Sequence, residues 1–195
     1  MNLSAGHQRL LLVLARLSIQ QALAARAAPA LPDDSTLQQP AGCFVSLHQT
    51  ASHRLRGCVG RLDAKAPLAQ TVAQMARAVL EDPRFLTDPV TLRELDELDI
   101  ELSILSPLAR VESPLDFEPL SHGIYLTHGE RSGCFLPQVA RDTGWNREQL
   151  LDRLCTEKLG LPGATWRQAE AKLYRFSVLL IGPERFFTAL DSPFD

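Results

Sequence analysis

The stretch CFVSLHQTASHRLRGCVGRL, residues 43–62, is the part of the chain that indicates its fold class. Its first residues alternate, with Cys43, Val45 and Leu47 on one side, as in a half-buried strand. A polar segment at 49–53 then predicts a turn, and RLRGCVGRL resembles a returning strand. We therefore predict a β-hairpin, in which the two strands pair in the antiparallel direction.

Helical and strand patterns follow one another irregularly in the rest of the chain. Apolar residues recur at helical spacing in some segments and alternate in others. No regular succession of strand, helix and parallel strand is present, so we predict an α+β fold, with an antiparallel sheet flanked by helices. The predicted helices span 4–27 and 66–81, with two short ones between 137 and 160, and the further strands span 100–105, 124–128, 134–136 and 171–182.

The N-terminal segment contains an apolar run that a secretory signal would also contain. Arg16 interrupts this run, whereas the apolar region of a signal usually has about 7 to 15 residues without a charge. Leu10, Val13, Leu14 and Leu17 fit one face of a helix instead. We therefore interpret the segment as an amphipathic helix, and we find no segment of membrane-spanning length.

The composition limits the classes of partner and cofactor. The formal net charge is −3, and without a basic stripe the chain is not expected to bind nucleic acid. The four cysteines form no Cys-x-x-Cys pair, so a structural zinc site is not predicted, and reduced cytosolic thiols are the better interpretation. His122 and His128 are chemically suited to bind a metal with Cys58 or Glu101, but no ligand spacing supports such a site.

A proline-rich connector begins near residue 107 and separates two sections of the chain. We predict that residues 107–167 form a smaller inserted α+β subdomain. Residues 1–106 and 168–195 are then predicted to form a larger subdomain that contains both chain ends.

Several stretches, in matching order, resemble the AMMECR domain family, which in prokaryotes is also called AmmeMemoRadiSam system protein A. The resemblance covers about residues 8–187. The family often has a glycine before the His-Gly pair, whereas this chain has Ser121 at that position. The similar stretches are CFVSLH (43–48), LRGCVG (55–60), EDPRF (81–85), DIELSILS (99–106), HGIYL (122–126), FLPQVARDTGW (135–145) and LCTEKLGLP (154–162).

This resemblance implies a cleft between the two subdomains. The biochemical activity of the family is not established, and its name comes from genomic association with a Memo-type protein and a radical SAM protein. The resemblance therefore implies a shared pathway with these two partners, without assigning a reaction or a cofactor to this component.

Cys58 lies inside the family signature and is the candidate nucleophile. Arg56 lies two residues away on the predicted strand and so shares its face, where a cation stabilises a thiolate. Gly57 and Gly60 leave the backbone open to a ligand or to a bulge. The structural alternative is a small core cysteine that needs glycine on either side, because free cysteines are among the most buried residues.

A thiol nucleophile also needs a base. His48, His53 and His122 are candidates, because imidazole accepts a proton near neutral pH. His48 lies on the adjacent strand of the hairpin, whereas His122 is expected at the start of the inserted block, beside the cleft that the resemblance implies. Glu101, inside an apolar strand, is a second kind of candidate for proton transfer.

Three more residues are candidates for ligand contacts or for local structure. Glu101 and Ser103 share one face of their predicted strand, which either lines a site or faces solvent. Arg84 either pairs with Asp82 or binds an anion, and Asp82 is expected to order the turn.

Together these features predict a cytoplasmic component of a modification pathway that binds a small polar or anionic ligand in the cleft between the subdomains. The alternative is a non-catalytic adaptor in which LRGCVG is structural, and whether the chain is an enzyme is left open. The predicted catalytic residues are Cys58, His122 and Glu101, and the predicted ligand-binding residues are Arg56, Gly57, Gly60, Arg84 and Ser103.

Overall fold

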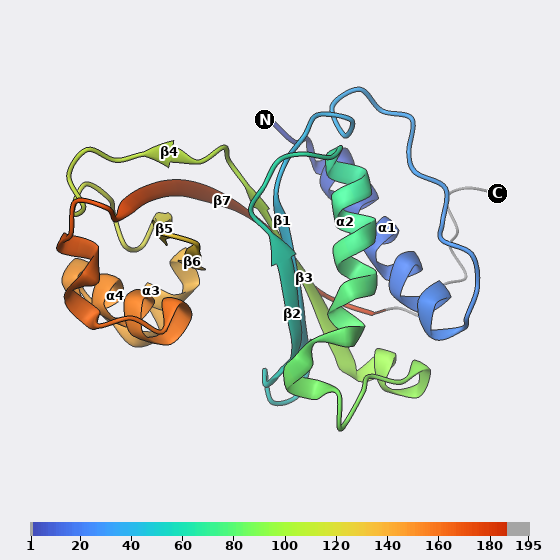
Figure 1. Ribbon diagram of the computed structural model, residues 1–195. Helices are drawn as coiled ribbons and strands as arrows, with labels where there is room; N and C mark the ends of the chain where they lie inside the picture. The colour runs from blue at the N-terminus through green and yellow to red at the C-terminus, as the bar shows by residue number, and fades with distance from the viewer. Residues whose placement is uncertain (1, 187–195) are drawn as a thin grey trace. The chain divides into compact units, whose positions relative to one another are not determined.

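The computed structural model describes residues 2–186, and the chain divides into two compact units (Figure 1). Unit 1 contains Met1–Ile104 and Leu179–Asp195, and unit 2 contains Leu105–Val178. Each unit has its own apolar core. The second predicted boundary, at 167/168, precedes the last strand, whereas the unit boundary falls within that strand. Residues 187–195 of the predicted larger subdomain lie outside the described residues.

The sheet of unit 1 is built on the predicted hairpin. β1 (Cys43–Gln49) pairs antiparallel with β2 (Leu55–Arg61) on one side and with β3 (Leu98–Leu105) on the other. The C-terminal part of β7 (Lys172–Arg185) follows β3, so the order is β2-β1-β3-β7 and β2 lies at the edge. The α+β fold class with an antiparallel sheet is thereby confirmed.

Two helices, α1 (Ala5–Leu23) and α2 (Leu68–Ala78), share an apolar core with β1 and β3 (Figure 1). The predicted face of the first helix was partly wrong, because α1 fully buries Leu11 and Leu14, whereas Val13 is only half-buried. The run LLLVL offers two overlapping apolar faces, and packing against the sheet selects between them.

Local signals set the bounds of these helices. Ser4 caps α1, since its hydroxyl accepts the His7 N–H at 3.2 Å while the His7 ring accepts the Ser4 N–H. The helix ends at Leu23, earlier than predicted. After α2, short 3-10 turns over Val79–Glu81 and Pro83–Phe85 replace the predicted helix end, and another at Leu92–Glu97 leads into β3.

Unit 2 contains further antiparallel strands and two short helices. The predicted hairpin is confirmed, with strands β5 and β6 paired and a shorter turn than expected. The strand order is β7-β5-β6, and β4 also pairs with β7. The elements are β4 (Ala109–Arg110), β5 (His122–His128), β6 (Arg131–Phe135), α3 (Pro137–Thr143), α4 (Arg147–Arg153) and a π-helical turn over Leu154–Leu159.

The helix ends of unit 2 follow their sequence signals. Asn146 forms the predicted capping box with Gln149, each side chain accepting the other's backbone N–H at 3.0 Å. Gly144 and Gly160 end their helices in the left-handed region, with φ of 68° and 63°. Among residues 2–186, no helix is both long and apolar enough to span a membrane.

Candidate functional site

The sheet of unit 1 has one apolar face and one polar face. The apolar face is formed by Cys43, Val45 and Leu47 of β1, which are fully buried in the core. Because strand residues alternate, the residues between them lie on the opposite side. We call this side the polar face, and the register of β1 with its two neighbours assigns to it Phe44, Ser46, His48, Cys58, Gly60, Asp99, Glu101 and Ser103.

Cys58 and Glu101 lie on the same row of the polar face. Ser46 of β1 stands between them, since it is the register partner of Cys58 on β2 and of Glu101 on β3. Neighbouring strands are about 4.8 Å apart, so the two predicted residues are separated by about 10 Å. Ser103, the next residue of β3 on this face, is 2% exposed. The structure thus brings these residues onto one surface, but Glu101 does not directly neighbour Cys58 along the row.

The backbone of Cys58 is held by two side chains from the EDPRF segment. Asp82 Oδ2 accepts the Cys58 N–H at 2.9 Å, and Arg84 Nη2 donates to the Cys58 carbonyl at 3.1 Å. β2 is an edge strand, so its outward backbone groups have no strand to pair with. Asp82 and Arg84 take the place of that strand, and we call this pair the edge clamp.

The two side chains of the edge clamp also bind each other. The Arg84 Nε and Nη2 atoms donate to Asp82 Oδ1 and Oδ2 at 3.0 and 2.6 Å, and the Arg84 N–H donates to Oδ1 at 3.0 Å. Asp82 is 2% exposed. The hydrogen bonds from Arg84, helped by the Cys58 N–H, outweigh burial and lower the Asp82 pKa to about 2. Asp82 therefore orders the turn, as predicted, and stays ionised in the folded protein.

Arg84 is also the guanidinium that is bound directly to Cys58, through the bond from its Nη2 to the Cys58 carbonyl. The Arg84 pKa is raised mainly by its hydrogen bond to Asp82, and further by the charge of that carboxylate. Cys58 is half-buried, and the Arg84 side chain is 55% exposed, so both are accessible from solvent. Sequence reasoning had assigned the neighbouring cation to Arg56.

Arg56 instead forms a buried ion pair. It is 3% exposed, and its Nε and Nη2 donate to the two carboxylate oxygens of Glu94 at 2.5 and 2.9 Å. Its Nη1 donates to the Asp88 carbonyl at 3.0 Å. Hydrogen bonds from Arg56 lower the Glu94 pKa. The guanidinium thus fastens β2 to the segment that precedes β3, and its predicted ligand contact stays a prediction.

The two signature glycines are positions of close packing. A Cβ on Gly60 would lie 2.2 Å from Phe44 Cγ, and one on Gly57 would lie 2.9 Å from Val79 Cγ2. Real Cβ atoms essentially never approach other atoms so closely. The room left by the absent side chains is therefore filled by protein atoms, and a ligand approach at these glycines stays a prediction.

His122 lies in unit 2, whereas Cys58 lies in unit 1. Its Nδ1, the acceptor nitrogen of the ring, accepts the Glu118 N–H at 2.9 Å. Joint action of His122 with Cys58, and the expected cleft, stay predictions. Within the described part of the chain, no group of three or more His, Cys, Asp or Glu residues is arranged to hold a metal.

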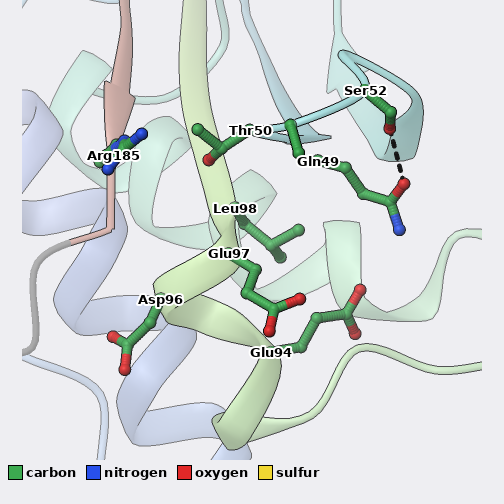
Figure 2. Close-up of a pocket in the computed structure, with 9 residues that line it drawn as sticks. Gln49, Thr50, Ser52, Glu94, Asp96, Glu97, Leu98 and Arg185 are labelled. Carbon is green, nitrogen blue, oxygen red and sulfur yellow. Dashed lines mark hydrogen bonds between the residues drawn. The ribbon is translucent and has the colours of Figure 1, made fainter.

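Unit 1 also contains a pocket of about 460 Å³ beside the hairpin turn (Figure 2). Three carboxylates and one guanidinium line it, so an anionic ligand does not suit it. Glu94 reaches it from the buried pair with Arg56, and the Ser52 hydroxyl donates to Gln49 within it at 2.8 Å. The predicted site residues are absent from its lining, which consists of Gln49, Thr50, Ala51, Ser52, Glu94, Asp96, Glu97, Leu98 and Arg185.

Sequence reasoning missed the partners that organise the polar face. Glu94 was not singled out, because nothing local marks a residue as the partner of an arginine 38 positions away. Asp99 was also missed, although it shares the face of Glu101 by simple alternation. That alternation was the available signal.

The antiparallel strands and the helices packed with them define an α+β protein. Its LRGCVG strand lies at the sheet edge and holds Cys58 near two closely packed glycines. The chain belongs to the AMMECR1 family, whose family model matches residues 12–181. The resemblance inferred from the sequence is thereby confirmed.

Relatives of known sequence and structure agree with this membership. The chain is 37% identical over 183 residues to a protein of Methanothermobacter thermautotrophicus, covering 89% of this chain and 93% of that protein. It is 39% identical over 142 residues to Protein MJ0810 of Methanocaldococcus jannaschii, covering 69% of each. Its fold is similar to the crystal structure of the uncharacterized protein PH0010 from Pyrococcus horikoshii, with a TM-score of 0.78, 32% identity and coverage of 87% and 88%.

Proposed function

We propose that this AMMECR1-family protein binds a small anionic or polar ligand at the Cys58–Arg84 pair and that the Cys58 thiol reacts there. The observation that supports the proposal is the Arg84 guanidinium, which donates to the carbonyl of Cys58, a cysteine whose side chain is only half-buried. A guanidinium pairs with a carboxylate, a phosphate or a thiolate, so the same group serves ligand binding and thiol chemistry.

The edge clamp supports this proposal by keeping Arg84 in place. Asp82 is almost fully buried and binds Arg84 through two nitrogens, so the guanidinium loses little further freedom when a ligand binds. The contact between Arg84 and the Cys58 carbonyl ties the cation to the strand that presents the thiol.

The wider setting of the proposal is a cytoplasmic modification pathway. The family resemblance supplies the partners, a Memo-type protein and a radical SAM protein. In this setting the protein presents or modifies an intermediate at Cys58 for those partners.

Two probes that alkylate thiols by the same reaction, but differ in charge, test the proposal. Iodoacetate carries a carboxylate and iodoacetamide does not, so the ratio of their rates at Cys58 measures the attraction for an anion. Two unit charges about 4 Å apart in water interact by about 1 kcal/mol, which corresponds to a roughly fivefold rate ratio. We expect the ratio to fall by about that factor in Arg84→Gln, measured by peptide-resolved mass spectrometry.

The matched control is Arg54→Gln, because Arg54 is an exposed arginine just before the same strand. It removes the same charge without touching the edge clamp, so it should leave the ratio unchanged. Equal ratios in wild type and Arg84→Gln would contradict the anion site. A Cys58 that is alkylated only after unfolding would contradict the thiol chemistry.

A second candidate function is a non-catalytic adaptor with a structural LRGCVG motif. The observation that favours it is the use of Arg56, Gly57 and Gly60 in a buried ion pair and in close packing. On this alternative, Cys58→Ser folds normally and keeps full pathway activity, and native Cys58 is labelled as slowly as a buried thiol. Loss of activity in a folded Cys58→Ser variant would contradict it.

A further inference from the structure

Three neighbouring strands bring a thiol, an imidazole and a carboxylate onto the polar face. Cys58 lies on β2, His48 on β1 and Asp99 on β3, in the spatial order β2-β1-β3. Cysteine, histidine and a carboxylate together form the set that activates a thiol nucleophile, with the carboxylate orienting the imidazole.

The register places His48 between the other two residues. It is the direct partner of Asp99, and it lies two residues from Ser46, which is the direct partner of Cys58. Cys58 and His48 are therefore diagonal neighbours, a separation of about 7–8 Å between Cα atoms that long or aromatic side chains can bridge. The strand pairing shifts at Leu47/His48, and such bulges re-aim side chains beside active sites.

The carboxylate of this set is held in place. Asp99 is 9% exposed, and its Oδ1 accepts the Thr50 hydroxyl at 2.8 Å. A carboxylate fixed by a hydroxyl and facing an imidazole can orient that ring and stabilise its protonated form. Thr50 follows the last residue of β1, so one short segment, 48–50, supplies both the imidazole and the hydroxyl that positions its partner.

We propose that His48 is the general base for the Cys58 thiol and that Asp99, held by Thr50, is its positioning residue. This inference rests on the proposed thiol function. In the step, a neutral ring nitrogen of His48 accepts the Cys58 proton, directly or through one water molecule. The S–H bond breaks, an N–H bond forms, and the products are a thiolate beside Arg84 and an imidazolium that faces Asp99.

The protonation state of His48 suits this role. Burial lowers the His48 pKa, and the charge of Asp99 opposes that shift only in part. The imidazole is thus neutral at neutral pH and available to accept a proton. The charged and titratable groups around it are Asp99 and Glu101 on β3, Arg56 and Cys58 on β2, and His53 in the hairpin turn.

The earlier candidates for this step are less well placed in the register. Glu101 is separated from Cys58 by the Ser46 strand, about 10 Å away. His122 belongs to unit 2 and already accepts a backbone N–H through Nδ1. His48 belongs to the strand that pairs directly with β2, so its position relative to Cys58 is set by backbone hydrogen bonds.

The test is the pH profile of alkylation of Cys58 by iodoacetamide, a neutral probe, followed by peptide-resolved mass spectrometry. In wild type we expect an inflection in the range where histidine titrates, below the usual thiol range near pH 8.5. His48→Gln should remove that inflection and slow the reaction at neutral pH by at least about tenfold. His7→Gln is the matched control, because His7 lies at the start of α1 and glutamine can also form the capping box there, so this variant should leave the profile unchanged.

Asp99→Asn and Thr50→Val test the positioning part of the inference. Each should slow the reaction by a smaller factor than His48→Gln while keeping the histidine inflection, because the base itself remains. All variants are compared under conditions where circular dichroism shows them folded.

The outcomes separate this inference from the proposed function. If wild-type Cys58 reacts and the His48→Gln profile superimposes on it, His48 is not the base, although the thiol function stands. If Asp99→Asn matches wild type, the positioning role is overturned. If native wild-type Cys58 does not react at all, the proposed thiol function fails, and the inference fails with it.

Discussion

Replacing Asp82 with asparagine should destabilise the protein and remove a defined part of its pH dependence. Asp82 is 2% exposed and accepts hydrogen bonds from the Cys58 N–H, the Arg84 N–H and the Arg84 guanidinium. An asparagine supplies only one acceptor oxygen, so its NH₂ group would face one of these donors. The Arg84 guanidinium would also lose the negative charge with which it pairs. Both effects raise the free energy of the folded state.

The magnitude follows from the pKa of this carboxyl. Its folded pKa is about 2, against the ordinary value of 3.8. The difference of about 1.8 pH units corresponds to about 2 kcal/mol of stability at neutral pH. Because the folded pKa is the lower one, this stability is present above pH 3.8 and is lost as the pH falls toward 2. At pH 3, about half of it should remain.

The assay is urea unfolding of wild type and Asp82→Asn, followed by circular dichroism between pH 7 and about pH 3 at constant ionic strength. The difference in unfolding free energy should be about 2 to 3 kcal/mol at neutral pH and should shrink as the solution is acidified. The control is Asp63→Asn, because Asp63 also pairs with an arginine, Arg61, but its side chain is 38% exposed.

Solvent screens such a pair, so the control should change stability by less than about 0.5 kcal/mol. A difference for Asp82→Asn that is the same at pH 3 and pH 7 would refute the assigned pKa. A difference as small as that of the control would refute the structural role of the edge clamp.

Three further changes have defined consequences. Gly60→Ala should cost several kcal/mol in urea unfolding, because its Cβ would lie 2.2 Å from Phe44 Cγ, and the double variant with Phe44→Ala should recover part of the loss. Glu94→Gln should cost about 3 kcal/mol by leaving the buried Arg56 charge poorly compensated, and a cost below about 1 kcal/mol would show that Arg56 finds another partner. Asn146→Ala should cost about 1 kcal/mol in thermal unfolding, since it removes the side-chain oxygen that accepts the Gln149 N–H, and an unchanged midpoint would contradict that cap.

The parts of the fold that could be predicted are those that depend on local chemistry. The hairpin over 43–62 followed from strand alternation on either side of a polar turn. The capping box at Asn146 and the left-handed glycine at Gly160 followed from residue types at fixed offsets. The buried face of α1 was less certain in the sequence, because an unbroken apolar run is compatible with more than one face.

The candidate site could be predicted only in part. Cys58, Glu101 and Ser103 were correctly expected to lie on strands, and the register places them on one face. The partner of Arg56 was not predicted, since Glu94 is 38 residues away in the sequence. Periodicity describes which way a side chain points, but it does not describe which distant segment packs against it.

By itself, the sequence determined the elements and the family. Alternation, turn residues and helix caps act between residues a few positions apart, so they can be recognised without a structure. The tertiary structure decided that LRGCVG is an edge strand and that Asp82, 24 residues beyond Cys58, satisfies its outward backbone. It also decided that Arg84 binds the carbonyl of Cys58, whereas the Arg56 guanidinium pairs with Glu94. The physical reason is that an unpaired strand edge and a buried guanidinium both require partners, and chain packing alone selects which residues supply them.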